Sequence, residues 1–185
     1  FLSDEALRAL HAASPLADEA AIAEGLAFSV DLRAGRAGWR AKPHAGVVDL
    51  GRVGHYDPRL FWDEVLPEDG RIILDPGAFY ILMSRESVAV PPGHAAEMAP
   101  YLAMAGEFRV HYAGFFDPGF GWGAPARGVL EVRAHEAPFA LEHGQVVGRL
   151  RYERMSERPD VLYGAGLGSN YQGQALKLSK HFREP

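Results

Sequence analysis

The chain has 185 residues, of which 48% are hydrophobic and 23% are charged, a balance typical of a soluble globular protein with its own core. It contains no cysteine, which excludes disulfide and thiolate chemistry, and its formal net charge of −5 gives no sign of a nucleic-acid partner. No apolar run approaches the roughly 18 residues of a membrane span. We therefore expect a cytoplasmic protein that binds neither nucleic acid nor membrane. Because the chain starts at Phe1 without a leader, we also expect a piece of a longer or processed product.

The N-terminal third mixes one helix with weak strand signals. Ser3 is a suitable N-cap, and Asp4 is favourable in the first helical turn, so a helix is expected to begin here. Residues 25–32 alternate apolar and polar side chains, which predicts a half-buried strand. A further strand is expected at 47–50 and a short helix or irregular stretch at 57–65.

After Gly70, short strand-like runs separated by turn residues indicate an all-β sandwich or barrel. Strands are expected at 71–74, 78–83, 87–90, 108–113, 128–133, 138–141 and 145–152, with a short helix or loop at 94–104. The predicted organisation is a helical segment at 1–24, a β-barrel domain at 25–162 and a C-terminal arm at 163–185.

The most informative stretch runs from Val110 to Phe120 and is followed by a strand that carries Glu131. Its Asp117-Pro118-Gly119 sequence is a turn, because Asp can bond its own backbone, Pro fixes φ and Gly tolerates a positive φ. Two strands joined in this way form a slot in which backbone groups read a flat heterocycle and a carboxylate moves protons. On the spacing alone, the alternative is favoured: a surface hairpin with a solvated or salt-bridged Glu131.

A series of motifs in order resembles the dCTP deaminases of the trimeric dUTPase-like superfamily, and the match covers most of the chain from about residue 25. A dUTPase shares the fold and the hairpin, but the distance from the turn to Glu131 and the Tyr-x-x-Gln tail are closer to the deaminases. The motifs are Ser29 to Arg33, Asp75-Pro76-Gly77 with Phe79-Tyr80, Glu86 to Pro91, Val110-His111 to Phe120, Val129-Leu130-Glu131, Leu141 to Leu150 and Asn170 to Gln174.

The resemblance implies a mainly β fold, a dUTPase-like distorted β-barrel of the β-clip type with a short N-terminal helix. It implies hydrolytic deamination of dCTP to dUTP, with Glu131 activating water for attack at C4 and carrying the proton to ammonia. The pyrimidine would be bound in the 110–120 hairpin. The residues implied in substrate binding are Tyr112, Ala113, Gly114 and Asp117 in the hairpin, and Gln145, Tyr171 and Gln174 towards the sugar and phosphates.

The same resemblance implies the partners of the chain. Mg²⁺ would arrive with the triphosphate, since hard oxygen ligands suit it. No zinc is expected, because the chain lacks the His and Cys pattern of zinc deaminases. The nucleotides dCTP, dUTP and dTTP are the expected ligands, and a trimer or a pseudo-trimer of fused halves is the expected assembly.

Departures from the family pattern leave two rival functions open. The Ser-Ser-x-x-Arg segment before the Val-His strand is replaced by residues 100–107, without a hydroxyl pair or arginine, and the lysine before the tail tyrosine is replaced by Asn170. A C-terminal half of a fused deaminase would tolerate these losses if another half supplied the serine and arginine. One rival is a dUTPase or a bifunctional deaminase-diphosphatase. The other is a degenerate structural or regulatory half that binds a nucleotide.

Overall fold

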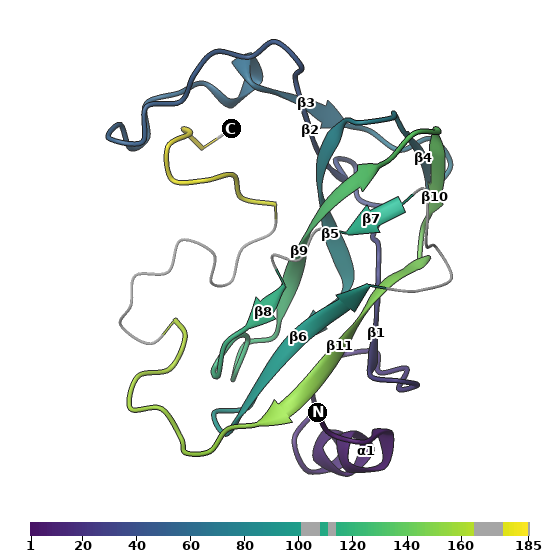
Figure 1. Ribbon diagram of the computed structural model, residues 1–185, viewed down its shortest axis with the longest axis vertical. Helices are drawn as coiled ribbons and strands as arrows, with labels where there is room; N and C mark the ends of the chain where they lie inside the picture. Colours follow the sequence, from purple (N-terminus) through teal and green to yellow (C-terminus); the bar gives the residue numbers. More distant parts are fainter. Residues whose placement is uncertain (101–107, 111–113, 165–175, 185) are drawn as a thin grey trace.

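The computed structural model describes residues 1–100, 108–110, 114–164 and 176–184, and it is mainly β with one short helix (Figure 1). Within these ranges, no helix has the length and apolar character needed to cross a membrane. The predicted fold class is confirmed. The elements are α1 (Asp4–Ala13), β1 (Leu26–Ser29), β2 (Gly38–Ala41), the 3₁₀ turn η1 (Pro58–Leu60), β3 (Trp62–Val65), β4 (Arg71–Leu74), β5 (Phe79–Val88), β6 (His94–Pro100), β7 (Phe108–Val110), β8 (Phe115–Phe116), β9 (Ala126–Ala134), β10 (Phe139–Glu142) and β11 (Val146–Arg154).

Helix α1 begins where its cap predicts. The Ser3 hydroxyl accepts a hydrogen bond from the Ala6 N–H at 3.2 Å, and Asp4 and Glu5 lie in the first turn, where they complement the positive end of the helix dipole. Leu7 is fully buried and joins the main core. The helix is therefore packed against the barrel, and the proposed boundary at residue 24 stays a prediction.

Two antiparallel sheets enclose the core. One has the strand order β1-β11-β6-β8 and the other β3-β2-β5-β9-β7, while β10 and β4 form a separate pair. Figure 1 shows β6 and β11 running side by side below the crossing of β5 and β9. The side chains that fill the space between the sheets are fully buried and come from both, including Phe28, Leu82, Leu130, Leu150 and Tyr152.

Several predicted elements differ in the structure. Residues 62–65, expected to be helical or irregular, form β3, and β1 is buried on both faces rather than half-buried. Residues 47–50 form no strand, and Val47 is 92% exposed, because this short apolar run has no sheet edge to pair with. The predicted helix or loop at 94–104 is wrong for 94–100, which form β6; pairing with β11 overrides the helix preference of its alanines. The separate strands at 78–83 and 87–90 are largely one strand, β5, with a register shift between Met83 and Ser87.

The predicted hairpin is shared between the two sheets. Val110 at the end of β7 pairs with Val132 of β9, whereas Phe116 of β8 pairs with Ala96 of β6. The chain therefore changes sheets between 110 and 115, and residues 111–113 of the predicted strand lie outside the described residues. The turn itself is confirmed, since the Phe120 N–H donates to the Asp117 carbonyl at 3.0 Å.

The described C-terminal segment, 176–184, packs on the long loop that follows β2. Backbone N–H groups of Gly54, His55 and Tyr56 donate to the carbonyls of Lys180 and His181 at 2.9–3.1 Å. Figure 1 shows this segment beside the loop, next to the five-stranded sheet. The last described part of the chain is thus held by tertiary contacts.

Gly128 of β9 provides a test of the core packing. A Cβ at this position would lie 2.3 Å from the Cζ of Phe28, a fully buried ring that packs edge-on against Phe116. We expect Gly128→Ala to lower the free energy of unfolding by about 1–3 kcal/mol, because the buried ring has to shift. Urea denaturation measures this. Gly35→Ala is the control, since a Cβ there meets nothing within 4 Å, and an equal loss in both variants would contradict the packing argument.

Candidate functional site

Glu131 lies on the outer face of β9, away from the core between the sheets. The residues on either side of it, Leu130 and Val132, are fully buried in that core, while Glu131 is half-buried. Because side chains alternate across a strand, the carboxylate points to the opposite side of the sheet. Glu131 is therefore available at a surface of this chain.

The neighbours of Glu131 on that face are apolar or engaged elsewhere. Ile81 of β5 is its direct partner in the ladder, and Trp39 of β2 is in turn the partner of Ile81. The nearest cation along β9, Arg133, has its guanidinium 5.0 Å above the ring of Phe79. The carboxylate therefore lies at the end of a row of apolar side chains, which is a suitable floor for a flat heterocycle.

A partly buried ion pair fixes the beginning of β9. Asp31 is only 7% exposed, and its Oδ2 lies 2.6 Å from the Arg127 guanidinium. Its Oδ1 accepts the Arg33 N–H at 3.0 Å and lies 3.4 Å from His143 Nδ1. Burial by itself raises the pKa of Asp31, but the Arg33 hydrogen bond and the Arg127 charge outweigh it and hold the pKa below its ordinary value.

A second buried carboxylate connects β1 with β5. Glu86 accepts hydrogen bonds from the Ser29 N–H at 2.8 Å and from the Ser29 hydroxyl at 2.5 Å. Next to it, the Ser84 hydroxyl donates to the Glu86 carbonyl and accepts the Gly128 N–H at 2.8 Å. The Ser84 hydroxyl and the Glu86 carboxylate thus have hydrogen-bond partners at the irregular stretch of β5. Because one of those partners is the Gly128 N–H, the network fixes β9 three residues before Glu131.

Asp31 and Glu86 stand in motifs that resemble the family, but no role was predicted for them, and Arg127 and His143 were not predicted as their neighbours or partners. One signal was present: both carboxylates interrupt apolar strand runs, and a carboxylate buried in a sheet needs a charged or hydrogen-bonding partner. The identity of those partners was not readable, since Arg127 and His143 are 96 and 112 residues from Asp31.

The predicted substrate-binding residues fall on different elements, and four of them, Tyr112, Ala113, Tyr171 and Gln174, lie outside the described residues. Gly114 is buried against β6, and its carbonyl accepts the Met98 N–H at 2.8 Å. Asp117 is exposed in its turn, and the side chain of Gln145 accepts the Glu142 N–H at 3.0 Å. These contacts do not themselves connect Gly114, Asp117 or Gln145 with Glu131, and the roles of the three residues stay predictions.

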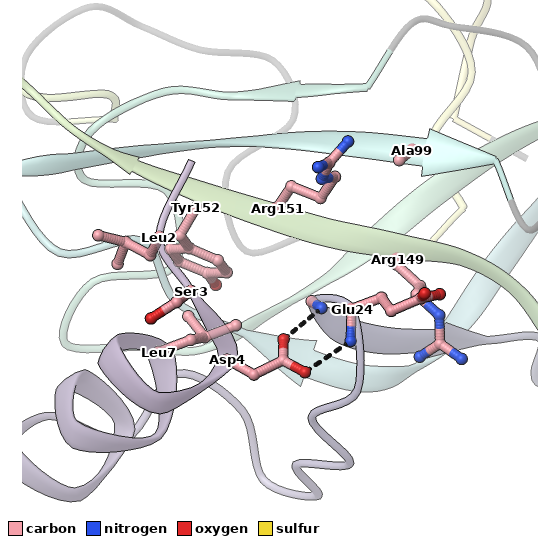
Figure 2. A pocket seen from close by; sticks show the side chains of 10 residues that line it. Leu2, Ser3, Asp4, Leu7, Glu24, Ala99, Arg149, Arg151 and Tyr152 are labelled. Atoms are coloured by element: carbon pink, nitrogen blue, oxygen red, sulfur yellow. Dashed lines mark hydrogen bonds between the residues drawn. The ribbon is translucent and has the colours of Figure 1, made fainter.

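A cavity of about 460 Å³ lies beside α1, on the other sheet (Figure 2). Arg149, Arg151 and Asp4 line it, and Asp4 accepts the backbone N–H groups of Glu24 and Gly25 at 2.8 and 2.9 Å. The two hydrogen bonds lower the pKa of Asp4, and the bond from Gly25 has the larger effect. The carboxylate is thus used to dock α1. Within the described ranges, no group of three metal-binding side chains could hold an ion.

Comparisons with known proteins point to one family. Residues 3–182 match the family model of the 2'-deoxycytidine 5'-triphosphate deaminase (DCD), C-terminal domain. The chain is 33% identical over 137 residues to a "dCTP deaminase, dUMP-forming" of Corynebacterium jeikeium, covering 69% of this chain and 71% of that protein. It is 29% identical over 150 residues to a dCTP deaminase of Natronomonas pharaonis, covering 79% and 74%.

A solved structure extends the comparison to the fold. The crystal structure of 2'-deoxycytidine 5'-triphosphate deaminase from Agrobacterium tumefaciens superposes with a TM-score of 0.80 at 49% sequence identity. The match covers 86% of this chain and 50% of that one, so the chain spans about half the length of that protein. At this identity and similarity, the predicted dUTPase-like β fold is confirmed.

Asp31 gives a test of the polar anchor of β9. Its lowered pKa means that ionised Asp31 stabilises the fold at neutral pH, and that this contribution is lost as the pH falls below about 4. We expect Asp31→Asn to lower the free energy of unfolding at pH 7 by about 1.5–3 kcal/mol, and to flatten its acid dependence. Urea denaturation from pH 7 to pH 3.5 measures both effects.

The matched control is Asp63→Asn, which removes an exposed partner of Lys42. A solvent-exposed pair contributes only about 0–1 kcal/mol. If Asp31→Asn and Asp63→Asn destabilise the fold equally at pH 7, the anchoring role of Asp31 is wrong.

Proposed function

The chain belongs to the family of 2'-deoxycytidine 5'-triphosphate deaminase C-terminal domains, and from that premise we propose that it takes part in the hydrolytic deamination of dCTP to dUTP. The reaction belongs to pyrimidine deoxynucleotide metabolism and takes place in the cytoplasm. The observation that carries the proposal is the position of Glu131, half-buried on the outer face of β9 at the end of an apolar row.

Glu131 acts as general base and then as general acid. Its carboxylate takes a proton from a water molecule whose oxygen attacks C4 of cytosine, which makes a tetrahedral carbon bearing OH and NH₂. The glutamic acid delivers that proton to N3 of the ring. The carboxylate then takes the proton of the C4 hydroxyl and passes it to the amino group, the C4–N bond breaks, and ammonia leaves as the C4 carbonyl of uracil forms. The net change is the addition of water and the loss of ammonia. Such proton transfers typically contribute about 10²–10⁴-fold to a rate.

The 110–120 segment binds the pyrimidine, with Tyr112, Ala113, Gly114 and Asp117 around the base. Gln145, Tyr171 and Gln174 contact the sugar and phosphates. The substrate is the magnesium complex of dCTP, in which phosphate oxygens and water provide the ligands of the ion. No zinc takes part in this scheme.

The missing serine and arginine are supplied by another half or another chain. The sequence at 100–107 has neither a hydroxyl pair nor an arginine. Support comes from the outer face of β9, where Arg127 is paired with Asp31 and Arg133 lies over Phe79, so that these two cations already have partners within the chain. The active assembly is therefore an oligomer, a trimer or a pseudo-trimer of fused halves, which also binds dUTP and dTTP.

A second function has specific support. The relative from Corynebacterium jeikeium and another from Pseudarthrobacter chlorophenolicus, 31% identical to this chain over 137 residues, are both named "dCTP deaminase, dUMP-forming". A bifunctional reaction would release pyrophosphate together with ammonia, whereas a simple deaminase would release ammonia alone. A dUTPase would release pyrophosphate from dUTP without deaminating dCTP. Measuring both products therefore separates the three activities.

Glu131→Gln tests the catalytic role. In the complete assembly with dCTP and Mg²⁺, we expect ammonia release to fall by about 10²-fold or more, because an amide cannot take the proton from water. Nucleotide binding, measured by calorimetry, is expected to persist. Glu153→Gln, an exposed position on β11, is the matched control and is expected to retain full activity.

Unchanged ammonia release in Glu131→Gln would overturn the assigned role. If the wild-type assembly binds nucleotide but releases neither ammonia nor pyrophosphate, the degenerate structural or regulatory half becomes the better account.

A further inference from the structure

A second cavity, of about 750 Å³, is lined by residues of β2, β3, β4 and β5. Its distinctive element is β4, which belongs to a sheet of only two strands and pairs there with β10. Figure 1 shows β4 and β10 side by side at the margin of the molecule. Because β10 occupies one edge of β4, the other edge is available to a further strand.

The second edge of β4 presents the backbone of Ile73. In an antiparallel pair, the N–H and C=O of one residue point to the same side, and those of the next residue point to the other side. The Gly70 carbonyl accepts the His143 N–H at 2.8 Å, so the even-numbered residues of this stretch face β10. The odd-numbered residues, Ile73 among them, therefore face away from β10.

The backbone groups before and after Ile73 on this edge already have partners. Arg71 exchanges two hydrogen bonds with Glu68, at 2.9 and 3.0 Å. The Asp75 N–H donates to the Tyr80 hydroxyl at 2.9 Å. Among the described residues, nothing meets the N–H or the C=O of Ile73 on this edge. One donor and one acceptor of the same residue are thus open to an added strand.

Exposed apolar side chains lie in the same cavity. Ile73 is 64% exposed and Leu66 is 65% exposed, and both line the cavity together with the buried Val65 and Ile72. Directly opposed side chains of neighbouring strands pack against each other. A strand added at Ile73 would therefore cover its side chain with an apolar one.

The charges around the cavity favour a basic partner. The two arginines that line it are each bound to a carboxylate, Arg40 to Asp75 and Arg71 to Glu142. Glu68 and Asp69 also line the cavity, and neither forms an ion pair with a residue that the structure describes. Two carboxylates without a cation, at one end of an open strand edge, attract a Lys or Arg side chain.

The cavity is separate from the face of β9 that presents Glu131. Arg40 pairs with Tyr80, and Tyr80 pairs with Val132, the neighbour of Glu131 along β9. Successive side chains of a strand point to opposite faces, so Arg40 and Tyr80 point away from the side of Glu131. Binding at this cavity therefore does not depend on the proposed function.

We propose that the open edge of β4 and the cavity beside it bind an extended, basic segment of a partner protein. The segment adds to β4 as a strand, and one of its residues exchanges two hydrogen bonds with Ile73 and packs an apolar side chain against it. A Lys or Arg two positions away meets Glu68 and Asp69. In this mode of recognition the main-chain bonds provide affinity and the side chains provide specificity.

A labelled peptide tests the proposal on the full chain. The probe is a fluorescein-labelled five-residue peptide, lysine-threonine-valine-threonine-lysine, with a blocked C-terminus, and fluorescence polarisation at low ionic strength measures its binding. We expect saturable binding that weakens about tenfold when the valine nitrogen is methylated, because the methyl group removes a hydrogen bond and obstructs the edge. Methylation of the central threonine nitrogens is expected to change binding less than about twofold, since their N–H groups point away from β4.

The two methylated peptides carry the same charge, so general attraction to a chain of net charge −5 cannot separate them. Hydrogen exchange provides a direct observation of the bond. We expect the Ile73 N–H to exchange more slowly when the unmethylated peptide saturates the chain.

Ile73→Lys tests the edge from the side of the protein, with Val53→Lys as the matched control. The two side chains are 64% and 65% exposed, so both variants are expected to fold. We expect Ile73→Lys to weaken peptide binding about tenfold or more, because a lysine on an edge strand opposes pairing and repels the basic peptide. Val53→Lys is expected to bind as the wild type does.

Glu68→Gln tests the charge, with the exposed Glu153→Gln as its control. We expect Glu68→Gln to weaken binding about threefold, as for an exposed ion pair, and Glu153→Gln to leave it unchanged. The proposal is overturned by any of three results: no saturable binding up to about 1 mM peptide, equal weakening by the two kinds of methylation, or equal binding by the two lysine variants. If Ile73→Lys fails to fold, the methylated peptides with the wild-type chain decide.

Discussion

The ladder between β5 and β9 is the constraint on which the rest of this structure depends. Its register places Leu82 opposite Leu130 and Ile81 opposite Glu131. Because successive side chains point to opposite faces, a slip of one residue would bury Glu131 between the sheets and expose Leu130. Burial of an unpaired carboxylate costs several kcal/mol, and exposure of the leucine forfeits about 2 kcal/mol more, so only the observed register is stable.

Polar groups inside the sheets hold this ladder where apolar packing is irregular. The strand β5 shifts its register between Met83 and Ser87, and the Ser84 hydroxyl and the Glu86 carboxylate supply partners at that point. The Asp31–Arg127 pair holds the segment that follows β1 against the beginning of β9. An apolar core alone would tolerate several arrangements here, whereas satisfied hydrogen bonds between buried groups favour one. The proposed general base thus projects from a strand that is fixed before the nucleotide arrives.

The charge of the chain bears on how a triphosphate could be bound. With a net charge of −5, the protein offers no general positive field, so phosphate has to be met by local groups. The cations nearest to Glu131 along β9 are already engaged, Arg127 by Asp31 and Arg133 by the ring of Phe79. This arrangement fits the proposal of a site that is shared with another half or chain.

The sequence by itself determined the elements whose signals are local. The Ser3 cap indicated α1, the Asp117-Pro118-Gly119 turn was readable from its residue types, and short strand-like runs between turn residues indicated β9 and β11. The ordered motifs also identified the family, and they are the source of the proposed role of Glu131. Only the tertiary structure decided that 94–100 form a strand, that the hairpin is shared between two sheets, and that Trp39 meets Leu176. Those features depend on partners far along the chain, and the free energy of burying such pairs together outweighs the local preference of either segment.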